Sequence, residues 1–348
     1  MEGVAGLWFD VADLDNDGRL DLVFMKYTGV EVWKNMGNYK FKPSTILPRQ
    51  ERIKNVRAMV QFDYDNDGDL DLYFVRGSSG RSIPNTFYEN VNGKYVDRTS
   101  AAGLVLGGYN VHVTAGDFNN DGCVDLYVTV NTGLEGRQDD KLMLNNCDKT
   151  FSEVPAGRTG MKSRNKNEDG DNVHAVDVQM DGKLDIISGS MNSTWRYYKN
   201  TTPTDNNHWI IVRVGAPRPS RWNASWLRSE MGALVRVFCG DQIFTQRVNS
   251  PGRSHSASHY NMLHFGLGKC TKVKKITVHY VNGIKAATAS TLVDRIKNVG
   301  LFFRCPKGFE GAQCKKRVPG CSANPCPRMG LCEIYTRGNS RRFCKLPA

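Results

Sequence analysis

The sequence lacks several features that would assign it to a common functional class. Its 348 residues contain no apolar run near the roughly 20 residues that a membrane-spanning helix requires, so we expect no transmembrane segment. No G-x-S-x-G, H-E-x-x-H, P-loop or dinucleotide-binding glycine motif is present. Because these motifs carry much of hydrolase, metalloprotease and nucleotide chemistry, we predict that the protein is not an enzyme.

Acidic residues are scarce in the second half of the chain. Residues 208–348 carry 24 Lys and Arg against 5 Asp and Glu, a net charge of +19, whereas residues 1–207 carry 23 against 30, a net charge of −7. The basic half is either a solvated surface or a binding site for a polyanion such as a heparin-like glycosaminoglycan. The candidate residues for such a site are Lys269, Lys272, Lys274, Lys275, Lys315, Lys316 and Arg317.

Cysteine, by contrast, is frequent, and six of the ten cysteines lie between Cys305 and Cys344. Such a density predicts disulfides and an oxidising compartment. Three N-x-[ST] sequons agree with glycosylation outside the cell, at Asn192, Asn200 and Asn223. We therefore predict a secreted, extracellular protein, for which nucleic acid is not an expected partner.

Four acidic loops of nine residues recur along the first 205 residues. They are DLDNDGRLD at 13–21, DYDNDGDLD at 63–71, DFNNDGCVD at 117–125 and DVQMDGKLD at 177–185. Oxygen-bearing side chains at positions 1, 3 and 5 can converge on one point, as the hard cation Ca²⁺ requires, and glycine at position 6 permits a sharp turn. Each loop leads into an apolar run, and the spacing of 50, 54 and 60 residues is typical of β-propeller blades.

An EF-hand is the alternative interpretation of these loops. That motif requires Glu at position 12 and flanking helices. Position 12 is occupied by Phe24, Phe74, Val128 and Ser188. The flanking residues alternate between apolar and polar, which favours strands, so the EF-hand is excluded.

A second phrase follows each loop, in which an apolar residue and an asparagine precede a turn and then an aromatic residue. The examples are 33–35 (WKN) before Phe41, 88–90 (YEN) before Tyr95 and 144–146 (LNN) before Phe151, while 198–200 (YKN) begins the same phrase. We predict that each unit consists of strand, loop, strand, strand, turn and outer strand. Residues 78–87 and 155–172 are predicted to be surface insertions.

The pattern D-x-[DN]-x-D-G-x-L-D before an apolar strand resembles the FG-GAP/VCBS repeat of integrin α propellers. The resemblance implies that Ca²⁺ is bound by the side chains of positions 1, 3, 5 and 9 and by the backbone carbonyl of position 7. The residues implied are Asp13, Asp15, Asp17, Arg19 and Asp21; Asp63, Asp65, Asp67, Asp69 and Asp71; Asp117, Asn119, Asp121, Cys123 and Asp125; and Asp177, Gln179, Asp181, Lys183 and Asp185. Neutral Asn119 and Gln179 at position 3 predict weaker binding in the third and fourth loops.

The resemblance also bears on the N-terminus. A propeller of this kind is expected to have about seven blades, but only four are visible. Residues 1–4 (MEGV) contain an acid and no apolar segment of the kind that a signal peptide requires. We therefore expect that the natural N-terminus is missing.

Residues 206–303 have a different character. The phrases NHWI at 207–210, MGALVRV at 231–237, HFGLG at 264–268 and ITVHYVNG at 276–283 resemble, in this order, the ASPIC/UnbV domain. The resemblance implies a second β-rich domain without established chemistry, with an Asn-Gly hairpin after its last phrase. The YVNG sequence departs from the W-P-x-G that is usual in that family.

The cysteines of residues 304–348 resemble those of EGF-like modules. The resemblance implies three bridges, which are Cys305–Cys314, Cys321–Cys332 and Cys326–Cys344. The second module then lacks its final pair, so either the C-terminus is incomplete or the module is degenerate. The spacings are poor for zinc. Cys123 with Cys147 and Cys239 with Cys270 are left open as further bridges.

The order of these three blocks is similar to that of the cartilage acidic protein family. It predicts an all-β fold, with a partial β-propeller of FG-GAP/VCBS blades over 1–205, an ASPIC/UnbV domain over 206–303 and a disulfide-rich tail over 304–348. It implies a secreted, Ca²⁺-binding scaffold that contacts an extracellular-matrix or cell-surface protein. The net charge of +12 does not suit the family name, so no property based on acidity is carried over.

Two alternative functions stay open. One is a glycosaminoglycan-binding module that uses the basic half, and the other is an enzyme that acts on glycans at the axial face of the propeller. His255, His259 and His264 could form a metal or acid–base cluster, although a polar loop and the start of a strand explain them better. His112 and His174 both follow Asn-Val and are interpreted as structural.

Overall fold

The computed structural model describes residues 8–78, 83–131, 139–161, 170–190, 195–215, 230–248, 262–281 and 283–299, and four short strands beyond residue 300. The chain divides into two units, Met1–Gly300 and Leu301–Ala348. Among the residues that the structure describes, strands account for 52% and helices for 3%, which confirms the all-β prediction. Within the described ranges, no helix has the length and apolarity of a membrane span.

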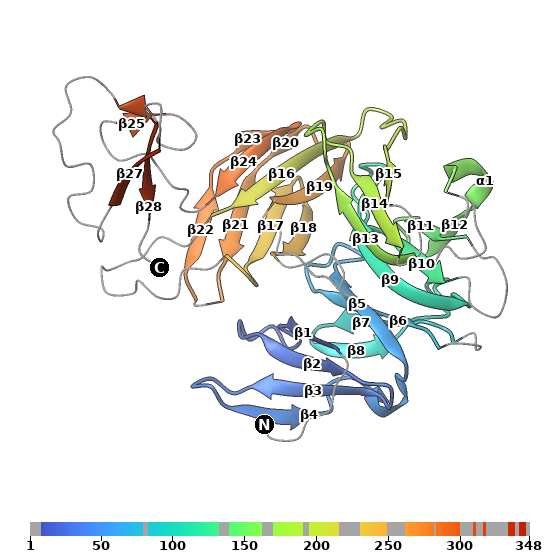
Figure 1. Cartoon of the computed structure of the whole chain (residues 1–348). Helices are drawn as coiled ribbons and strands as arrows, with labels where there is room; N and C mark the ends of the chain where they lie inside the picture. Colours follow the sequence, from blue (N-terminus) through green and yellow to red (C-terminus); the bar gives the residue numbers. More distant parts are fainter. Residues whose placement is uncertain are drawn as a thin grey trace. The chain divides into compact units, whose positions relative to one another are not determined.

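Each of the first three repeats forms a four-stranded antiparallel sheet whose strands follow the order of the chain (Figure 1). The strands are β1 (Trp8–Ala12), β2 (Asp21–Met25), β3 (Val30–Asn35) and β4 (Phe41–Ser44); β5 (Val56–Phe62), β6 (Asp71–Arg76), β7 (Thr86–Val91) and β8 (Lys94–Asp97); and β9 (Tyr109–Gly116), β10 (Asp125–Asn131), β11 (Lys141–Asn145) and β12 (Phe151–Val154). The fourth repeat is described as β13 (Gly170–Val176), β14 (Asp185–Ser190) and β15 (Arg196–Tyr198). Each acidic loop joins the first two strands of its sheet, as predicted.

The connections between repeats contain the only helices of the described part. A short 3-10 helix, η1 (Gln50–Arg52), precedes β5, and α1 (Ala156–Thr159) lies within the predicted insertion 155–172. Neither helix buries a residue. The two helices therefore do not add to the core. The predicted insertion 78–87 was too long at its end, because β7 begins at Thr86 and Phe87 is buried. In the second insertion, Met161 packs against a buried cluster.

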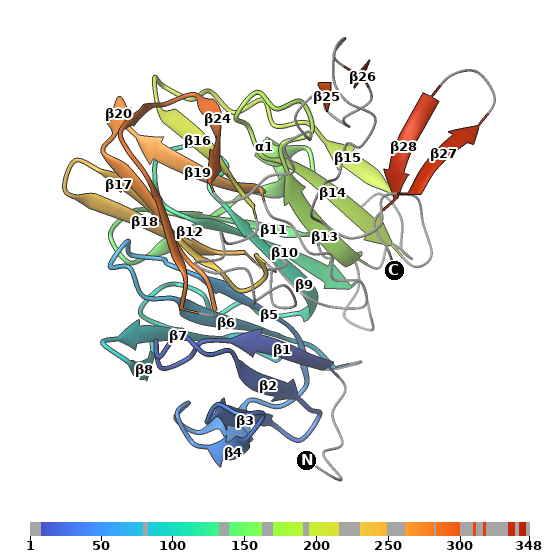
Figure 2. The same cartoon turned by 90° about the vertical axis from the view of Figure 1, so that its left-hand side faces the viewer.

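Neighbouring sheets pack through their first strands, so that β5, β9 and β13 lie side by side (Figures 1 and 2). Apolar side chains fill the space between the second and third sheets, where Phe62, Phe87 and Phe151 belong to one buried cluster. The Tyr64 ring meets that of Phe87 edge to face, with 4.9 Å between the ring centroids. The described repeats do not form a closed propeller, so the partial propeller stays a prediction.

A second core lies in residues 208–299 of the same unit. One sheet contains β16 (His208–Val214), β19 (Met262–Gly268) and β24 (Arg295–Val299); another contains β17 (Leu234–Cys239), β18 (Gln242–Arg247), β21 (Lys275–His279) and β22 (Lys285–Thr288); and β20 (Lys272–Val273) pairs with β23 (Thr291–Leu292). The inward side chains of Val212, Val235 and Phe265 share one cluster. The predicted hairpin is present, because β21 pairs with β22.

The second unit, Leu301–Ala348, is described only through two strand pairs. They are β25 (Phe309–Glu310) with β26 (Lys316–Arg317) and β27 (Glu333–Arg337) with β28 (Arg341–Lys345). The cysteine side chains of the three predicted EGF-like bridges lie outside the described part. The same holds for the side chains of Lys315, Lys316, Arg317, Asn192, Asn223, His255 and His259. These assignments, and the boundary between residues 205 and 206, stay predictions.

Candidate metal centre in the acidic loops

The carboxylate at position 1 organises each acidic loop. In the second loop, Asp63 Oδ1 accepts the Asp67 N–H at 3.1 Å and Asp63 Oδ2 accepts the Gly68 N–H at 3.1 Å. The same two bonds, between 2.6 and 3.2 Å long, form in the other three loops. The glycines at position 6 have φ between 85° and 96°, which a residue with a Cβ resists. The repeated sequence therefore produces one repeated backbone cradle.

The carboxylate at position 9 ties each of the first three loops to the third strand of its sheet, and Asp185 ties the fourth loop to Asn200, just after β15. Asp71 accepts N–H groups from Asn90 at 2.8 Å and from Tyr64 at 2.9 Å. In the third repeat it is Asn145 that donates to Asp125, at 2.8 Å. The expected phrase at 144–146 was therefore wrong by one residue, because the repeated asparagine is Asn145 and the phrase spans 143–145.

Three acidic side chains converge in each of the first two loops. Their ligand oxygens lie within 4.8 Å of one another in the groups Asp13, Asp15 and Asp17, and Asp63, Asp65 and Asp71. The Oδ1 atom of Asp15 is buried and has no hydrogen-bond partner. A carboxylate oxygen that accepts one N–H also keeps a lone pair for a second interaction. These donors fit a hard cation that prefers oxygen ligands.

Burial raises the pKa of the carboxyl groups that build these loops. The pKa of Asp21 rises to about 6, chiefly through burial, with contributions from the Asp15 and Asp17 charges. Burial, followed by the charge of neighbouring acids, also holds the pKa of Asp63 well above its usual range. Because like charges in a desolvated site favour protonation, a bound cation would favour the ionised form of these groups.

Two lysines lie against the loops, and sequence reasoning did not find them. Lys34 contacts Asp15, and Lys149 Nζ lies 2.7 Å from Asp65 Oδ2 and 2.8 Å from Glu89 Oε1. The hydrogen bonds to Asp65 and Glu89 raise the pKa of Lys149, so it is an ammonium group at neutral pH. A cation that binds the second loop must compete with this ammonium group for Asp65.

The third and fourth loops offer fewer charges, as expected from their neutral residues at position 3. Asn119 Nδ2 donates to Asp121 Oδ2 at 2.7 Å, and Gln179 Nε2 donates to the Tyr197 hydroxyl at 3.0 Å. Among the residues that the structure describes, no group of three carboxylates converges in either loop. The geometry is consistent with weaker cation binding at both.

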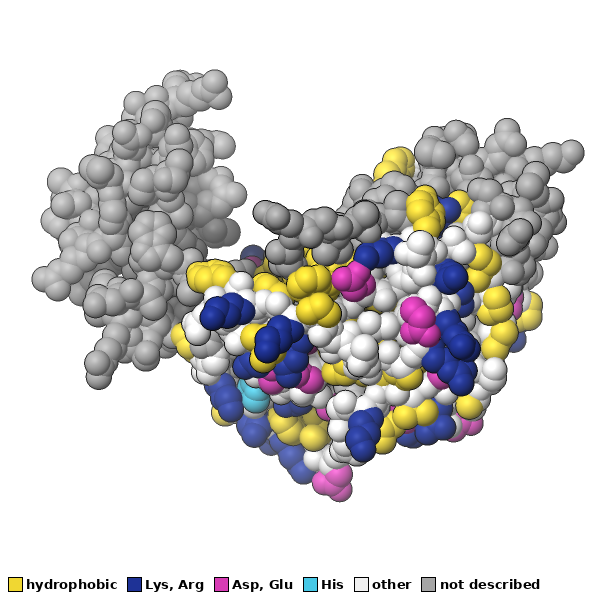
Figure 3. Space-filling model, turned by 90° about the horizontal axis from the view of Figure 1, so that it is seen from below, with side chains coloured by type: hydrophobic (Ala, Val, Ile, Leu, Met, Phe, Trp, Pro, Cys, Tyr) yellow, Lys and Arg dark blue, Asp and Glu magenta, His cyan; other side chains and the backbone are white. Residues whose placement is uncertain are grey.

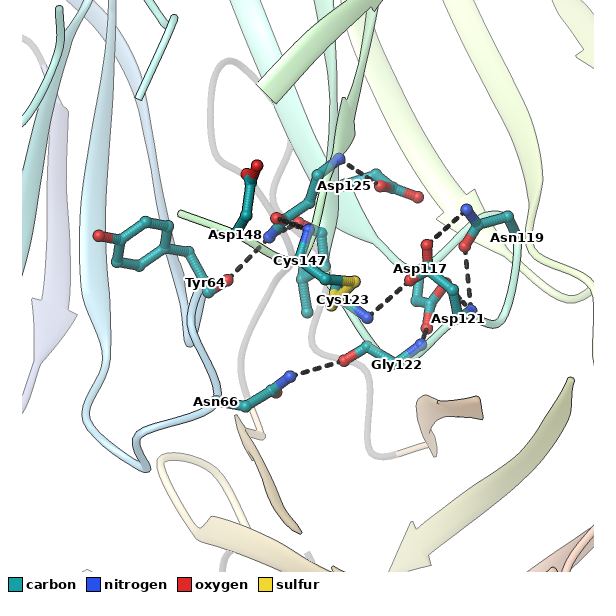
Figure 4. Close-up of a disulfide and its surroundings, with 12 residues drawn as sticks. Tyr64, Asn66, Asp117, Asn119, Asp121, Gly122, Cys123, Asp125, Cys147 and Asp148 are labelled. Carbon is teal, nitrogen blue, oxygen red and sulfur yellow. Dashed lines mark hydrogen bonds between the residues drawn. A yellow bond between two sulfur atoms is a disulfide. The ribbon is translucent and has the colours of Figure 1, made fainter. Parts of the chain in front are cut away.

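Two disulfides that the sequence left open are present. Cys123 at position 7 of the third loop pairs with Cys147 (Figure 4), with 5.6 Å between their Cα atoms. Cys239 pairs with Cys270, with 6.1 Å between the Cα atoms. The first bridge fixes the third loop to the turn that follows β11, so this loop is tied covalently as well as by hydrogen bonds.

Asparagine at position 4 joins neighbouring loops, a role that sequence reasoning passed over. Asn66 Nδ2 donates to the Gly122 carbonyl at 2.9 Å (Figure 4), and Asn120 Nδ2 donates to the Gly182 carbonyl at 2.8 Å. Both asparagines have left-handed backbones, with φ of 58° and 60°, which asparagine tolerates better than most residues. Asn16 has the same backbone and reaches Asp69. The recurrence of asparagine at position 4 in three of the four loops is the sequence pattern from which this role could have been predicted.

Asn200 is the predicted glycosylation site that the structure describes. Its Nδ2 atom donates to the Phe118 carbonyl at 2.7 Å, as that of Asn145 donates to the Tyr64 carbonyl at 2.8 Å. The amide nitrogen that a glycan would modify is therefore engaged between two repeats. Glycosylation of Asn200 stays a prediction.

Family comparisons agree with this organisation. The FG-GAP-like repeat matches residues 13–74 and 63–128, and the ASPIC and UnbV family matches residues 224–297. The chain carries FG-GAP-like repeats and an ASPIC/UnbV domain. These two predictions are confirmed, whereas membership of the cartilage acidic protein family is not. No curated protein matches the chain at a significant level.

Several solved structures show limited similarity to the chain. An Agrocybe aegerita lectin that recognises non-reducing terminal N-acetylglucosamine is 16% identical, with a TM-score of 0.33, over 82% of this chain and 80% of the lectin. The BBS1N protein, solved in complex with ARL6DN, is 10% identical, with a TM-score of 0.34, over 86% and 82%. The Vibrio cholerae biofilm matrix protein Bap1 is 14% identical, with a TM-score of 0.26, over 86% and 51%. At these TM-scores the likenesses carry no functional argument.

Proposed function

We propose that this protein is a secreted extracellular scaffold whose repeat loops bind structural Ca²⁺. The observation that carries the proposal is the backbone cradle shared by all four loops, with three converging acidic side chains in the first two. FG-GAP-like repeats and disulfides, which are typical of extracellular proteins, support the compartment. Bound Ca²⁺ would supply the positive charge that these desolvated carboxylates need.

The loops suit a structural role better than direct contact with a partner. The carboxylates at positions 1 and 9 are buried in every loop, with exposures of 8% or less. They accept hydrogen bonds from the backbone of their own repeat, which fixes the first two strands. A matrix or cell-surface protein would therefore contact other parts of the surface. The proposed role involves adhesion and no catalysis.

Calorimetric titration of the EDTA-treated full chain with CaCl₂ tests the proposal. Extracellular modules bind Ca²⁺ with dissociation constants of about 10⁻⁴–10⁻³ M, and we expect at least two sites in this range. A double variant, Asp17→Asn with Asp67→Asn, should lose both, because each substitution removes a position-5 charge. Asp241→Asn, an exposed acid outside the loops, is the matched control. No binding heat, together with no change in thermal stability on chelation, would refute the metal assignment.

A glycosaminoglycan-binding role is the second candidate, and one observation favours it. Lys269, Lys272 and Lys274 line an open depression of about 740 Å³ beside the Cys239–Cys270 bridge. Lys275 differs, since its Nζ atom lies 4.6 Å from the centroid of the Phe238 ring. On the face shown in Figure 3, Lys and Arg side chains are interspersed with acidic and hydrophobic ones.

Heparin chromatography separates the two candidates. At about 150 mM salt, surface charges are screened beyond about 8 Å. Retention of the wild type at this salt concentration, together with loss of retention in Lys272→Glu, would support binding at the depression. Elution in the void volume at that salt concentration would dispose of the glycosaminoglycan site and leave the scaffold proposal intact.

A further inference from the structure

The segment 264–268 (HFGLG), which had no assigned role, lies against the third and fourth acidic loops. The Gly268 N–H donates to the Asn120 carbonyl at 3.0 Å, and His264 Nε2 lies 2.9 Å from the Gly182 carbonyl oxygen. His264 is buried, and burial lowers its pKa, so the ring is neutral and can donate from Nε2. Both acceptors are backbone carbonyls of the loops.

Two glycines make this close approach possible. A Cβ atom on Gly266 would lie 1.8 Å from Asp117 Oδ2, and a Cβ on Gly268 would lie 2.7 Å from the Asp121 carbonyl oxygen. Real Cβ atoms essentially never approach other heavy atoms closer than 3.0 Å. Any side chain at either position would therefore have to displace the third loop.

The first and second loops also contact residues of the same domain. Arg236 Nη2 donates to the Gly68 carbonyl at 3.3 Å. The side chain of Arg247 is buried, and its Nη2 atom lies 3.6 Å from Asp13 Oδ2. Together with the contacts at 264–268, these interactions place side chains or backbone of the 208–299 domain against all four acidic loops.

We propose that the ASPIC/UnbV domain is the docking partner of the acidic loops and that docking of residues 262–268 is coupled to cation binding. The inference rests on the proposed binding of Ca²⁺. The carbonyls that the domain uses, at positions 4 and 6, alternate along the backbone with the expected ligand positions 3, 5 and 7. A cation that orders this backbone therefore also holds the carbonyls in the positions that docking requires. By thermodynamic linkage, docking then strengthens cation binding by the same factor by which cation binding strengthens docking.

Hydrogen exchange on the wild-type full chain tests the coupling. We expect the backbone amides of 262–268, and that of Gly268 above all, to exchange more slowly in Ca²⁺ than in EDTA. Calorimetry on the same sample establishes whether Ca²⁺ binds. Residues 264–268 contact the third and fourth loops, so the titration is carried to a Ca²⁺ concentration that fills these weaker sites. Binding at more than two sites without any change in exchange over 262–268 would overturn the coupling and leave the metal sites intact. Binding at two sites only, with no change in exchange, would also overturn it. Absence of binding would instead refute the proposed function.

A matched pair of variants gives a second, independent measurement. Gly268 and Gly240 belong to the same domain and have similar backbones, with φ of 53° and 60°, but a Cβ on Gly240 would meet nothing within 4 Å. We expect Gly268→Ala to weaken the apparent affinity for Ca²⁺ by about five-fold or more, the lower end of typical coupling. Gly240→Ala should leave it unchanged. Equal affinities of the two variants would overturn the proposal.

Discussion

Two substitutions in the second loop remove one carboxylate each, yet they should differ in their consequences. Asp67 is exposed, and its Oδ1 atom accepts the Asp69 N–H at 2.8 Å, a bond that an asparagine oxygen can also accept. Asp71 is 1% exposed, and its two oxygens accept N–H groups from Asn90 and Tyr64. Asparagine has only one acceptor oxygen, so Asp71→Asn leaves one buried N–H without a partner.

The magnitudes follow from these contacts. In EDTA, Asp71→Asn should lower the free energy of unfolding by about 1–3 kcal/mol, the cost of an unsatisfied buried group. Asp67→Asn should change it by about 0.5 kcal/mol or less, as is usual at exposed positions. In about 10 mM Ca²⁺, both variants should also lose the contribution of one cation, about 1.4–2.7 kcal/mol for a dissociation constant of about 10⁻³–10⁻⁴ M.

Urea denaturation of the full chain at pH 8, followed by circular dichroism in Ca²⁺ and in EDTA, measures both quantities. We expect the wild type and Asp67→Asn to coincide in EDTA and to separate in Ca²⁺, with Asp71→Asn less stable in both. If the two variants lost equal amounts of unfolding free energy in EDTA, the role of the Asp71 hydrogen bonds in closing the loop would be refuted. Coincidence of the wild type and Asp67→Asn in Ca²⁺ would refute the cation contribution.

Three further predictions concern contacts that surround the loops. Asn120→Gly should cost about 1 kcal/mol for the lost hydrogen bond and Asn120→Ala about 1 kcal/mol more for its left-handed backbone; equal unfolding energies would contradict this. Lys149→Gln should strengthen Ca²⁺ binding between about 1.5-fold and five-fold, the range expected of an exposed ion pair; calorimetry that shows weaker binding would exclude competition. Replacing Cys123 and Cys147 by serine opens a bridge with a separation of 24 residues and should cost about 3.5 kcal/mol by the chain-entropy relation; a non-reducing urea titration that shows no loss would contradict it.

Sequence patterns predicted the repeats well because the relevant forces are local. The alternation of apolar residues after each loop favoured strands, and these became β2, β6, β10 and β14. The prediction was wrong by one residue in the third repeat, where two consecutive asparagines, Asn145 and Asn146, both suit the phrase. Only the hydrogen bond between the Asn145 N–H and Asp125 distinguishes them. The residue types alone do not show which of two adjacent asparagines makes this bond.

Pairing of the isolated cysteines illustrates a second limit. Cys123 and Cys147 are 24 residues apart, and nothing in their spacing selects one partner over another. The antiparallel pairing of β10 with β11 brings the two ends of this segment together. The sequence offered this pair only as one open possibility, and the register of the sheet explains why it forms.

The amino-acid sequence by itself determined the acidic loops, because each loop is built from interactions among nine consecutive residues. Position 1 binds the N–H groups of positions 5 and 6, and a glycine adopts the backbone that this bond requires. What surrounds the loops was decided only by the tertiary structure. Lys149 lies on Asp65, and Arg236 reaches Gly68 across 168 residues of chain. Such contacts join residues that are distant along the chain, and they exist only once the sheets have packed against one another.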